Sequence, residues 1–293
     1  MVRKNKFQTI AINATLQNKS TLEISRHCHE VLTNMGINVV FTSNFNKLTN
    51  EINTKTLTDR NIIKRADLLL SIGGDGTILS SARKFGSLGL PILGVNLGKL
   101  GFLSDIAPEE ISQGLAEVLS GKYKEDNRIF LKATVNGENE SQIALNEIVI
   151  HSGTIAQLIE YELFIDGKYV YRQKADGIIF ATPTGSTAYS LSGGGPIVHP
   201  SVKSIIITPM FPHSLSSGTL IVEEKSLIEV KIISSKGKVK LSLDSHNTYS
   251  LNKGDLIEIS KNLSTFKLIH PENHDFFEGC RKKLGWSSGL TSN

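Results

Sequence analysis

The chain has 293 residues, of which 39% are hydrophobic and 20% charged, an ordinary globular composition that excludes wholesale disorder. Lys and Arg number 32 against 28 Asp and Glu, and the resulting formal charge of +4 argues against a nucleic-acid-binding protein but suits a small anionic ligand. The two cysteines, Cys28 and Cys280, are far apart in sequence, which argues against a disulfide scaffold and against a cysteine-based zinc site.

No targeting or membrane-spanning segment is expected. No window approaches 18 consecutive apolar residues, the length that a spanning helix requires. The apolar stretch at residues 7–12 is too short and too polar for the core of a signal peptide. With so few cysteines, the predicted compartment is the cytoplasm.

The first part of the chain alternates strand-like and helix-like segments. Helical spacing of apolar residues recurs at 24–35, at 78–85 and again after Pro108. Short apolar runs predict strands at residues 7–12, 37–41, 68–72 and 91–95. This alternation predicts an α/β domain over residues 1–125, with a parallel sheet and helices on both of its faces.

The pattern changes near residue 125, and helical periodicity almost disappears after it. Asp166-Gly167 separates two strand-like segments and is a strong signal for a two-residue hairpin turn. Other strands are predicted at residues 143–150, 177–181, 204–208, 227–233, 238–243, 256–260 and 266–270. These strands predict an all-β second domain over residues 126–270, built as a two-sheet sandwich. The tail, residues 271–293, carries apolar side chains that need cover, so it is expected to dock back on the first domain.

A glycine-rich loop, Gly73-Gly74-Asp75-Gly76-Thr77, stands between the predicted strand 68–72 and a helical pattern. Glycines at such a turn let backbone N–H groups approach a phosphate, and the helix N-terminus adds a positive dipole. A carboxylate there repels phosphate, which favours a role for Asp75 in accepting a proton from a hydroxyl or in organising magnesium. A plain tight turn with an Asx hydrogen bond is the alternative, and the missing P-loop lysine argues against a Walker-type site.

Three further segments carry polar chemistry. Residues 96–103 form a glycine-bearing loop after a predicted strand, where open α/β sheets bind ligands, although this segment taken alone favours a plain loop. The Asn146-Glu147 pair falls within the predicted strand 143–150 and suits sugar hydroxyls, although the spacing alone favours an edge-strand polar pair. Residues 175–196 are rich in glycine and small hydroxyl residues between apolar strands, which favours a binding loop over a flexible linker.

Taken together, these motifs closely resemble bacterial NAD kinase. The glycine-rich loop, the 96–103 segment, the Asn-Glu pair, the 175–196 stretch and a Leu284-Gly285-Trp286 tail occur in that family's order. The GGDG loop alone is shared with diacylglycerol and sphingosine kinases and with phosphofructokinases, whereas the Asn-Glu pair combined with TPTGSTAYS is specific. The resemblance implies the NAD kinase and diacylglycerol kinase-like fold, and phosphorylation of NAD at the 2′-hydroxyl of its adenosine ribose by ATP.

The resemblance also implies roles for individual residues. Asp75 is expected to be the catalytic aspartate. Phosphate contacts are expected from Gly73, Gly74, Gly76 and Thr77. Contacts to NAD are expected from Gly76, Asn146, Glu147, Asp176, Thr184, Thr187, Ala188, Tyr189, Ser192 and His246. The last of these belongs to Asp244-Ser245-His246, where many relatives have Asp-Gly-Gln.

The same resemblance implies a cofactor and partners. Mg²⁺ or another divalent cation is expected to bind mainly through the ATP phosphates, with no metal ligand set in the protein. NAD and ATP are the expected substrates, and a homodimer or homotetramer is the expected assembly, without nucleic acid or membrane.

Two rival functions are weighed against this one. A lipid kinase would share the GGDG loop, but it needs an apolar acceptor cleft or a membrane-contact surface, and the sequence has no basic amphipathic helix for one. A non-catalytic dinucleotide sensor would be indicated by loss of Asp75 or of the Asn146-Glu147 pair, and both are present.

Overall fold

The computed structural model describes residues 6–14, 18–45, 54–98, 101–153, 157–214, 217–245 and 247–286. Its internal contacts divide the chain into two compact units. The first comprises Met1–Asn127 and Thr265–Asn293, and the second comprises Arg128–Ser264. Two long strands, β6 (Tyr123–Val135) and β17 (Leu256–Pro271), carry the chain from one unit into the other.

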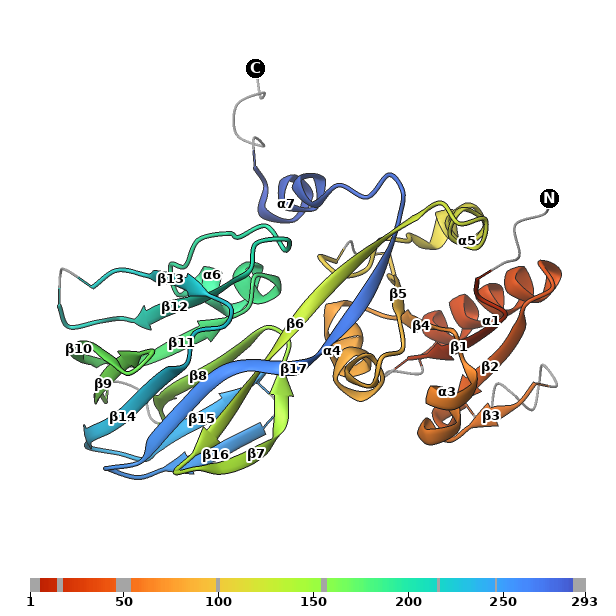
Figure 1. Ribbon diagram of the computed structural model, residues 1–293. Helices are drawn as coiled ribbons and strands as arrows, with labels where there is room; N and C mark the ends of the chain where they lie inside the picture. Colours follow the sequence, from red (N-terminus) through yellow and green to blue (C-terminus); the bar gives the residue numbers. More distant parts are fainter. Residues whose placement is uncertain are drawn as a thin grey trace, which may run out of the picture. The chain divides into compact units, whose positions relative to one another are not determined.

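The first unit is built on a parallel sheet, as predicted. Its strands follow the order β3-β2-β1-β4-β5, and the end of β17 continues it by pairing parallel to β5 (Figure 1). The strand bounds are Thr9–Asn13 for β1, Asn38–Thr42 for β2, Thr56–Leu57 for β3, Leu68–Ile72 for β4 and Ile92–Val95 for β5. All residues of β4 and β5 are buried, which agrees with their continuous apolar runs.

Helices cover both faces of this sheet. Apolar residues of α1 (Lys19–Asn34) and α5 (Ile111–Leu119) share a core with alternate residues of the strands. The opposite face meets α4 (Asp75–Lys84), whose Ser81 hydroxyl hydrogen-bonds Asn13 and Ser71 from that face. The remaining helical segments are η1 (Ser43–Phe45), α3 (Asp59–Arg65), η2 (Gly86–Leu88), η3 (Pro108–Glu110) and α7 (Phe276–Leu284).

The second unit contains two antiparallel sheets packed on one apolar core, as predicted. One sheet has the order β13-β12-β11-β8-β15-β16, and the other strands pair as β10-β9-β14-β17, with β6 paired to β17 and β7 paired to β6. Inward residues of both, such as Phe180 and Tyr161, lie in the same buried cluster. The strands are β7 (Glu138–Ala144), β8 (Glu147–Ser152), β9 (Ile159–Ile165), β10 (Lys168–Ala175), β11 (Gly177–Ala181), β12 (Ser204–Met210), β13 (Leu220–Glu223), β14 (Ile228–Ser235), β15 (Val239–Leu243) and β16 (Asn247–Leu251).

The hairpin prediction is confirmed, but two strand predictions are wrong. Asp166 and Gly167 both have positive φ angles, 52° and 74°, as a type I′ turn between β9 and β10 requires. The single strand predicted at residues 143–150 is two strands, β7 and β8, with Leu145 and Asn146 between them. The two strands predicted at 256–260 and 266–270 are one continuous strand, β17.

None of the helices in the described part of the chain combines the length and the apolar character that crossing a lipid bilayer would require.

Candidate active site

The glycine-rich loop lies at the carboxyl end of β4 and becomes the first turn of α4. Gly74 is the N-cap of this helix, and Asp75 is its first residue. Gly73 has a φ of +148°, and a Cβ there would lie 2.3 Å from the Thr77 Oγ1 atom, so only glycine fits. Gly74 and Gly76 are exposed, and the first N–H groups of a helix have no intrahelical acceptor. The loop therefore offers an anion exposed backbone donors and the positive end of a helix dipole.

The carboxylate of Asp75 is held by three donors. Leu103 N–H donates to Oδ1 at 3.0 Å, and Phe102 N–H donates to Oδ2 at 3.1 Å. The third donor is the Lys283 ammonium of α7, 2.7 Å from Oδ2. A Cβ at Gly101 would lie 2.2 Å from Asp75 Oδ1, so a glycine there is needed for the close approach. The structure thus brings the 96–103 segment and the C-terminal helix to the predicted catalytic residue.

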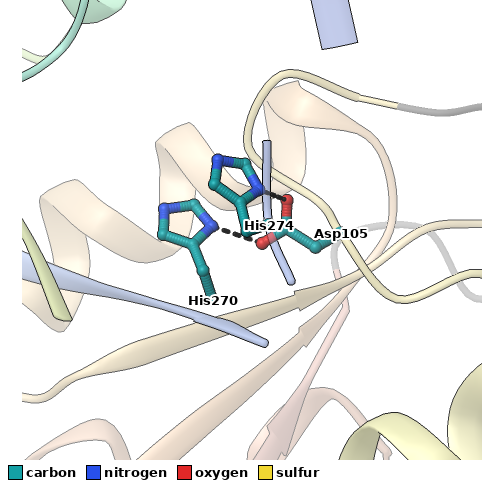
Figure 2. Close-up of side chains that lie close together, drawn as sticks. All are labelled: Asp105, His270 and His274. Atoms are coloured by element: carbon teal, nitrogen blue, oxygen red, sulfur yellow. Dashed lines mark hydrogen bonds and ion pairs between the residues drawn. The ribbon is translucent and has the colours of Figure 1, made fainter. Parts of the chain in front are cut away.

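Asp105 lies in the loop that follows the 96–103 segment, and it binds two histidines that precede α7 (Figure 2). Its two carboxylate oxygens each accept from a different imidazole Nδ1, one from His270 and one from His274, the latter at 2.9 Å. The two rings stack with their centroids 3.9 Å apart. Because His274 directly precedes Asp275, the N-cap of α7, this tail clamp of Asp105, His270 and His274 fixes where the helix begins.

One ligand atom from each residue of the tail clamp lies within 4.8 Å of the others, close enough to hold a metal ion. Among the described residues, this is the group of His, Cys, Asp and Glu side chains that meets this condition. Its geometry favours a hydrogen-bonded clamp, since stacked rings direct their lone pairs side by side rather than at one point. Burial alone would raise the pKa of Asp105. The hydrogen bonds and charge of His270 and His274 outweigh burial and hold that pKa well below its usual range.

A cavity of about 470 Å³ lies beside the tail clamp, between residues of α5 and α7. Its charged lining is mostly acidic, with Asp105, Glu109, Glu110, Glu117, Asp275 and Glu278 against Lys282. Such a lining repels a free phosphate group, so this cavity does not suit a nucleotide triphosphate by itself.

In the second unit, the carboxylate of Asp244 organises the Asn-Glu pair. It accepts hydrogen bonds from the backbone N–H groups of Leu145, Asn146 and Glu147, at 2.9, 2.8 and 3.1 Å. Asp244 itself has a φ of 44° and lies in the turn after β15. Since these N–H groups point to a side chain, they cannot join a strand ladder, which explains the break between β7 and β8.

Glu147 is a buried carboxyl group, only 4% exposed. Its Oε2 atom has no hydrogen-bond partner among the described residues. Burial, followed by the negative charge of Asp244, raises the pKa of Glu147 to about 8, while a hydrogen bond from the Tyr189 backbone opposes the rise. At neutral pH the group is therefore mainly a carboxylic acid, which can donate a proton to a ligand oxygen.

The loop after β11 packs directly on the Asn-Glu pair. The Thr182 hydroxyl donates to the Leu145 carbonyl at 2.6 Å, and a Cβ at Gly185 would lie 2.1 Å from the Asn146 carbonyl oxygen. This approach places η4 (Thr184–Thr187) beside Asn146, followed by α6 (Tyr189–Ser192). The buried Arg128 donates to the Thr184 hydroxyl at 3.1 Å.

The structure therefore groups part of the predicted NAD contacts. Thr184 is buried in this group, and Tyr189 contacts Glu147 through its backbone. The half-buried Thr187 and Ala188 and the exposed Ser192 follow along η4 and α6. Asp176 lies between β10 and β11, where its backbone N–H donates to the Met210 carbonyl. His246 lies outside the described residues, as do Lys99 and Leu100 of the 96–103 segment.

Three residues were missed by the sequence analysis: Arg128, Asp244 and Lys283. Asp244 stands in the tripeptide that departs from the family pattern, but the departure itself lies at the two residues that follow it, Ser245 and His246. Arg128 is buried at the start of an apolar run, and a cation beside such a run is the sequence signal that could have marked it. Lys283 follows two other cations, and nothing local distinguishes it from them.

Comparison with known proteins agrees with the geometry. Residues 5–123 match the model of the ATP-NAD kinase N-terminal domain, and residues 145–271 match that of the ATP-NAD kinase C-terminal domain. An NAD kinase of Pseudomonas putida is 41% identical over 292 residues, covering 98% of both chains. A crystal structure of yeast NADH kinase complexed with NADH superposes with a TM-score of 0.86 at 32% identity, over 99% of this chain and 91% of that one. An NAD kinase from Archaeoglobus fulgidus in complex with ATP has a TM-score of 0.71 at 26% identity, over 94% and 97%.

The raised pKa of Glu147 predicts a pH-dependent stability. Ionising this buried group costs stability, so its contribution is fully present below the pKa of an unfolded glutamate and is lost as the pH rises toward about 8. Glu147→Gln cannot ionise. Its melting temperature relative to wild type should therefore rise by at least about 3 °C between pH 5 and pH 9, as measured by calorimetry. The exposed Glu223→Gln is the control, and a parallel change in both variants would contradict the assignment.

The low pKa of Asp105 predicts the opposite dependence. The carboxylate stabilises the fold above the pKa of an unfolded aspartate, and this contribution is lost as the pH falls toward the folded value. Asp105→Asn should melt at least about 5 °C below wild type at pH 7, and the deficit should narrow below about pH 4. Glu278→Gln, which removes an exposed ion pair with Lys282 on α7, is the control. A deficit that does not change with pH would show that the charge of Asp105 is not what stabilises the clamp.

Proposed function

Because the chain belongs to the ATP-NAD kinase family, we propose that it transfers the γ-phosphoryl group of ATP to the 2′-hydroxyl of the adenosine ribose of NAD, forming NADP and ADP. The observation that carries this proposal is the carboxylate of Asp75, held at the head of α4 within a loop that suits phosphates. A carboxylate at that position can take the proton of a hydroxyl group that attacks a phosphate bound at the loop.

Asp75 is the proposed general base. The ribose oxygen forms a bond to the γ-phosphorus, the bond from phosphorus to the bridging oxygen of ADP breaks, and the hydroxyl proton passes to Asp75. An aspartate is a weak base toward an alcohol, so the proton moves late, as the oxygen bonds to phosphorus. The transition state is loose, and catalysis then rests on positioning and on neutralising charge.

Asn146 and Glu147 are proposed to hold the ribose hydroxyls of NAD. Glu147 in its neutral form donates a hydrogen bond and accepts another, and the Asn146 amide does both as well. Since Asp244 fixes the backbone of both residues, their side chains select which hydroxyl faces the donor. Thr187, Ala188 and Tyr189 would line the adenine with Thr184 and Ser192 nearby, while Asp176 would contact the nicotinamide end.

The phosphates are assigned to the backbone of Gly73, Gly74 and Gly76 and to Thr77; Gly74 and Gly76 are exposed, whereas Gly73 is buried. The loop offers one carboxylate, and its oxygens already accept three hydrogen bonds. This donor set does not form a cage for Mg²⁺, so the cation is proposed to enter with the ATP phosphates as part of the substrate.

The proposal extends to the roles of the two domains, the oligomeric state and the cellular compartment. Residues 1–125 with the tail 271–293 would form the nucleotide-binding domain, and residues 126–270 the NAD-binding domain, in a cytoplasmic homodimer or homotetramer. Self-association is supported by β10, a sheet-edge strand on which Tyr169 is 58% exposed. Light scattering on purified protein should give two or four times 32.0 kDa, and a mass of one chain would contradict the assembly.

Loss of the proposed base should abolish turnover and spare binding. Asp75→Asn should lower kcat by at least about 10²-fold, the general-base range, while the NAD affinity measured by calorimetry stays within about threefold. The assay incubates protein with NAD, ATP and Mg²⁺ and detects NADP with an NADP-specific glucose-6-phosphate dehydrogenase. Asp59→Asn, which removes an exposed partner of Lys84 in the same unit, is the control.

The outcomes separate the readings. Turnover that vanishes in Asp75→Asn and persists in Asp59→Asn supports the kinase. A kcat of Asp75→Asn near that of wild type contradicts the role of Asp75. Binding of NAD without turnover in wild type contradicts the kinase and favours a dinucleotide sensor.

A further inference from the structure

The glycine-rich loop lacks the positive charge that phosphoryl transfer needs. Residues 73–77 contain no basic side chain, and the cations of α4, Arg83 and Lys84, lie in its last turn. In phosphoryl-transfer enzymes a lysine or arginine near the γ-phosphate commonly stabilises the charge of the transition state. A cation from elsewhere in the chain must therefore reach this loop, or the donor's own Mg²⁺ must act alone.

Lys283 is such a cation, supplied by the C-terminal helix. Its Nζ atom lies 2.7 Å from the Oδ2 atom of Asp75 and 4.5 Å from the centroid of the Phe102 ring. The side chain is 27% exposed and that of Asp75 is 30% exposed, so this ion pair is open to a ligand on one side.

Several contacts aim α7 at this point. Gly279 and Lys283 are four residues apart and share a helix face, and a Cβ at Gly279 would lie 3.8 Å from the Phe102 ring. Asp275 caps the helix by accepting from Phe277 N–H at 2.9 Å, and the tail clamp binds the residue before it. Gly285, with a φ of 67°, ends the helix two residues after Lys283. The helix is thus anchored at its start and along its contact face, and it ends just after Lys283.

The three donors to Asp75 differ in freedom. The N–H groups of Phe102 and Leu103 belong to the backbone, whereas the ammonium ends a flexible four-carbon chain. An acceptor hydroxyl that donates to Asp75 Oδ2 competes with Lys283 for that atom. The displaced ammonium retains the face of Phe102 as a partner, which keeps its charge beside the reacting oxygen.

We propose that Lys283 is the mobile cation of the phosphoryl-transfer site, paired with Asp75 at rest and passing to the transferred phosphoryl group when the acceptor hydroxyl takes its place. No proton passes between Lys283 and Asp75 in this step. This inference rests on the proposed function, because it assigns the charge partner of that same reaction.

The test compares three variants of the full chain. Lys283→Met removes the charge and keeps most of the length, Lys283→Arg keeps the charge, and Lys282→Met is the matched control, because Lys282 pairs only with the exposed Glu278 among the contacts described. For each variant, kcat, the KM values for NAD and for Mg-ATP, and the melting temperature are measured. Lys283→Met should lower kcat by about 10²-fold with its melting temperature unchanged, the range for removing one preorganised transition-state donor.

The remaining readouts distinguish a charge effect from loss of structure. The KM for NAD should stay within about threefold in Lys283→Met, since the charge acts in the transition state. Lys283→Arg should recover at least about a tenth of the wild-type kcat, and Lys282→Met should match wild type. A kcat of Lys283→Met that is unchanged or raised contradicts the proposal, as does an equal loss in Lys283→Met and Lys283→Arg. So does a loss of kcat that only follows a lowered melting temperature.

Failure of this inference is distinguishable from failure of the proposed function. If wild type makes NADP and Asp75→Asn does not, the kinase stands, and Lys283→Met alone decides the role of the lysine. If wild type makes no NADP, both proposals fall together.

Discussion

A carboxylate withdrawn from water must recover its hydrogen bonds from the protein, and three aspartates meet this need with segments far apart in sequence. Asp75 gathers the backbone of Phe102 and Leu103 and the ammonium of Lys283. The two oxygens of Asp105 accept from His270 and His274, and Asp244 binds three consecutive N–H groups from Leu145 onward. Each of these carboxylates holds a segment that is distant in sequence, so the local arrangement around each follows from satisfying its hydrogen bonds.

The spacing of apolar residues predicted the α/β domain and the all-β domain, because the pattern within each strand or long helix shows which of its faces is buried. The runs at β4 and β5 and the turn at Asp166-Gly167 are local signals of this kind. The contacts that build the site are not local. Lys283 lies 208 residues from Asp75, and Asp244 lies 98 residues from Asn146. No window of a single sequence contains both partners, so the break between β7 and β8 and the contact of Lys283 with Asp75 could not be predicted, although the docking of the tail on the first domain could.

The carboxyl groups of Asp75 and Glu147 have opposite electrostatic surroundings. Asp75 is half-exposed and faces two amide donors and an ammonium, so its surroundings supply positive partial charge. Glu147 is buried beside a second carboxylate, and its raised pKa makes it a neutral acid near pH 7. One group can accept a proton and the other can donate a hydrogen bond, although both are carboxylates. Environment rather than residue type therefore sets the protonation of a buried carboxyl group such as Glu147.

The C-terminal helix shows how a marginal element acquires a precise position. A helix of nine residues is barely stable by itself, so α7 depends on tertiary contacts. The tail clamp anchors its start, its Gly279 face packs on Phe102, and its Lys283 reaches Asp75 from the same face. Phe102 also donates its N–H to Asp75, so one residue contacts the helix with its side chain and the carboxylate with its backbone. The packing of α7 on Phe102 therefore also sets where the Lys283 ammonium meets Asp75.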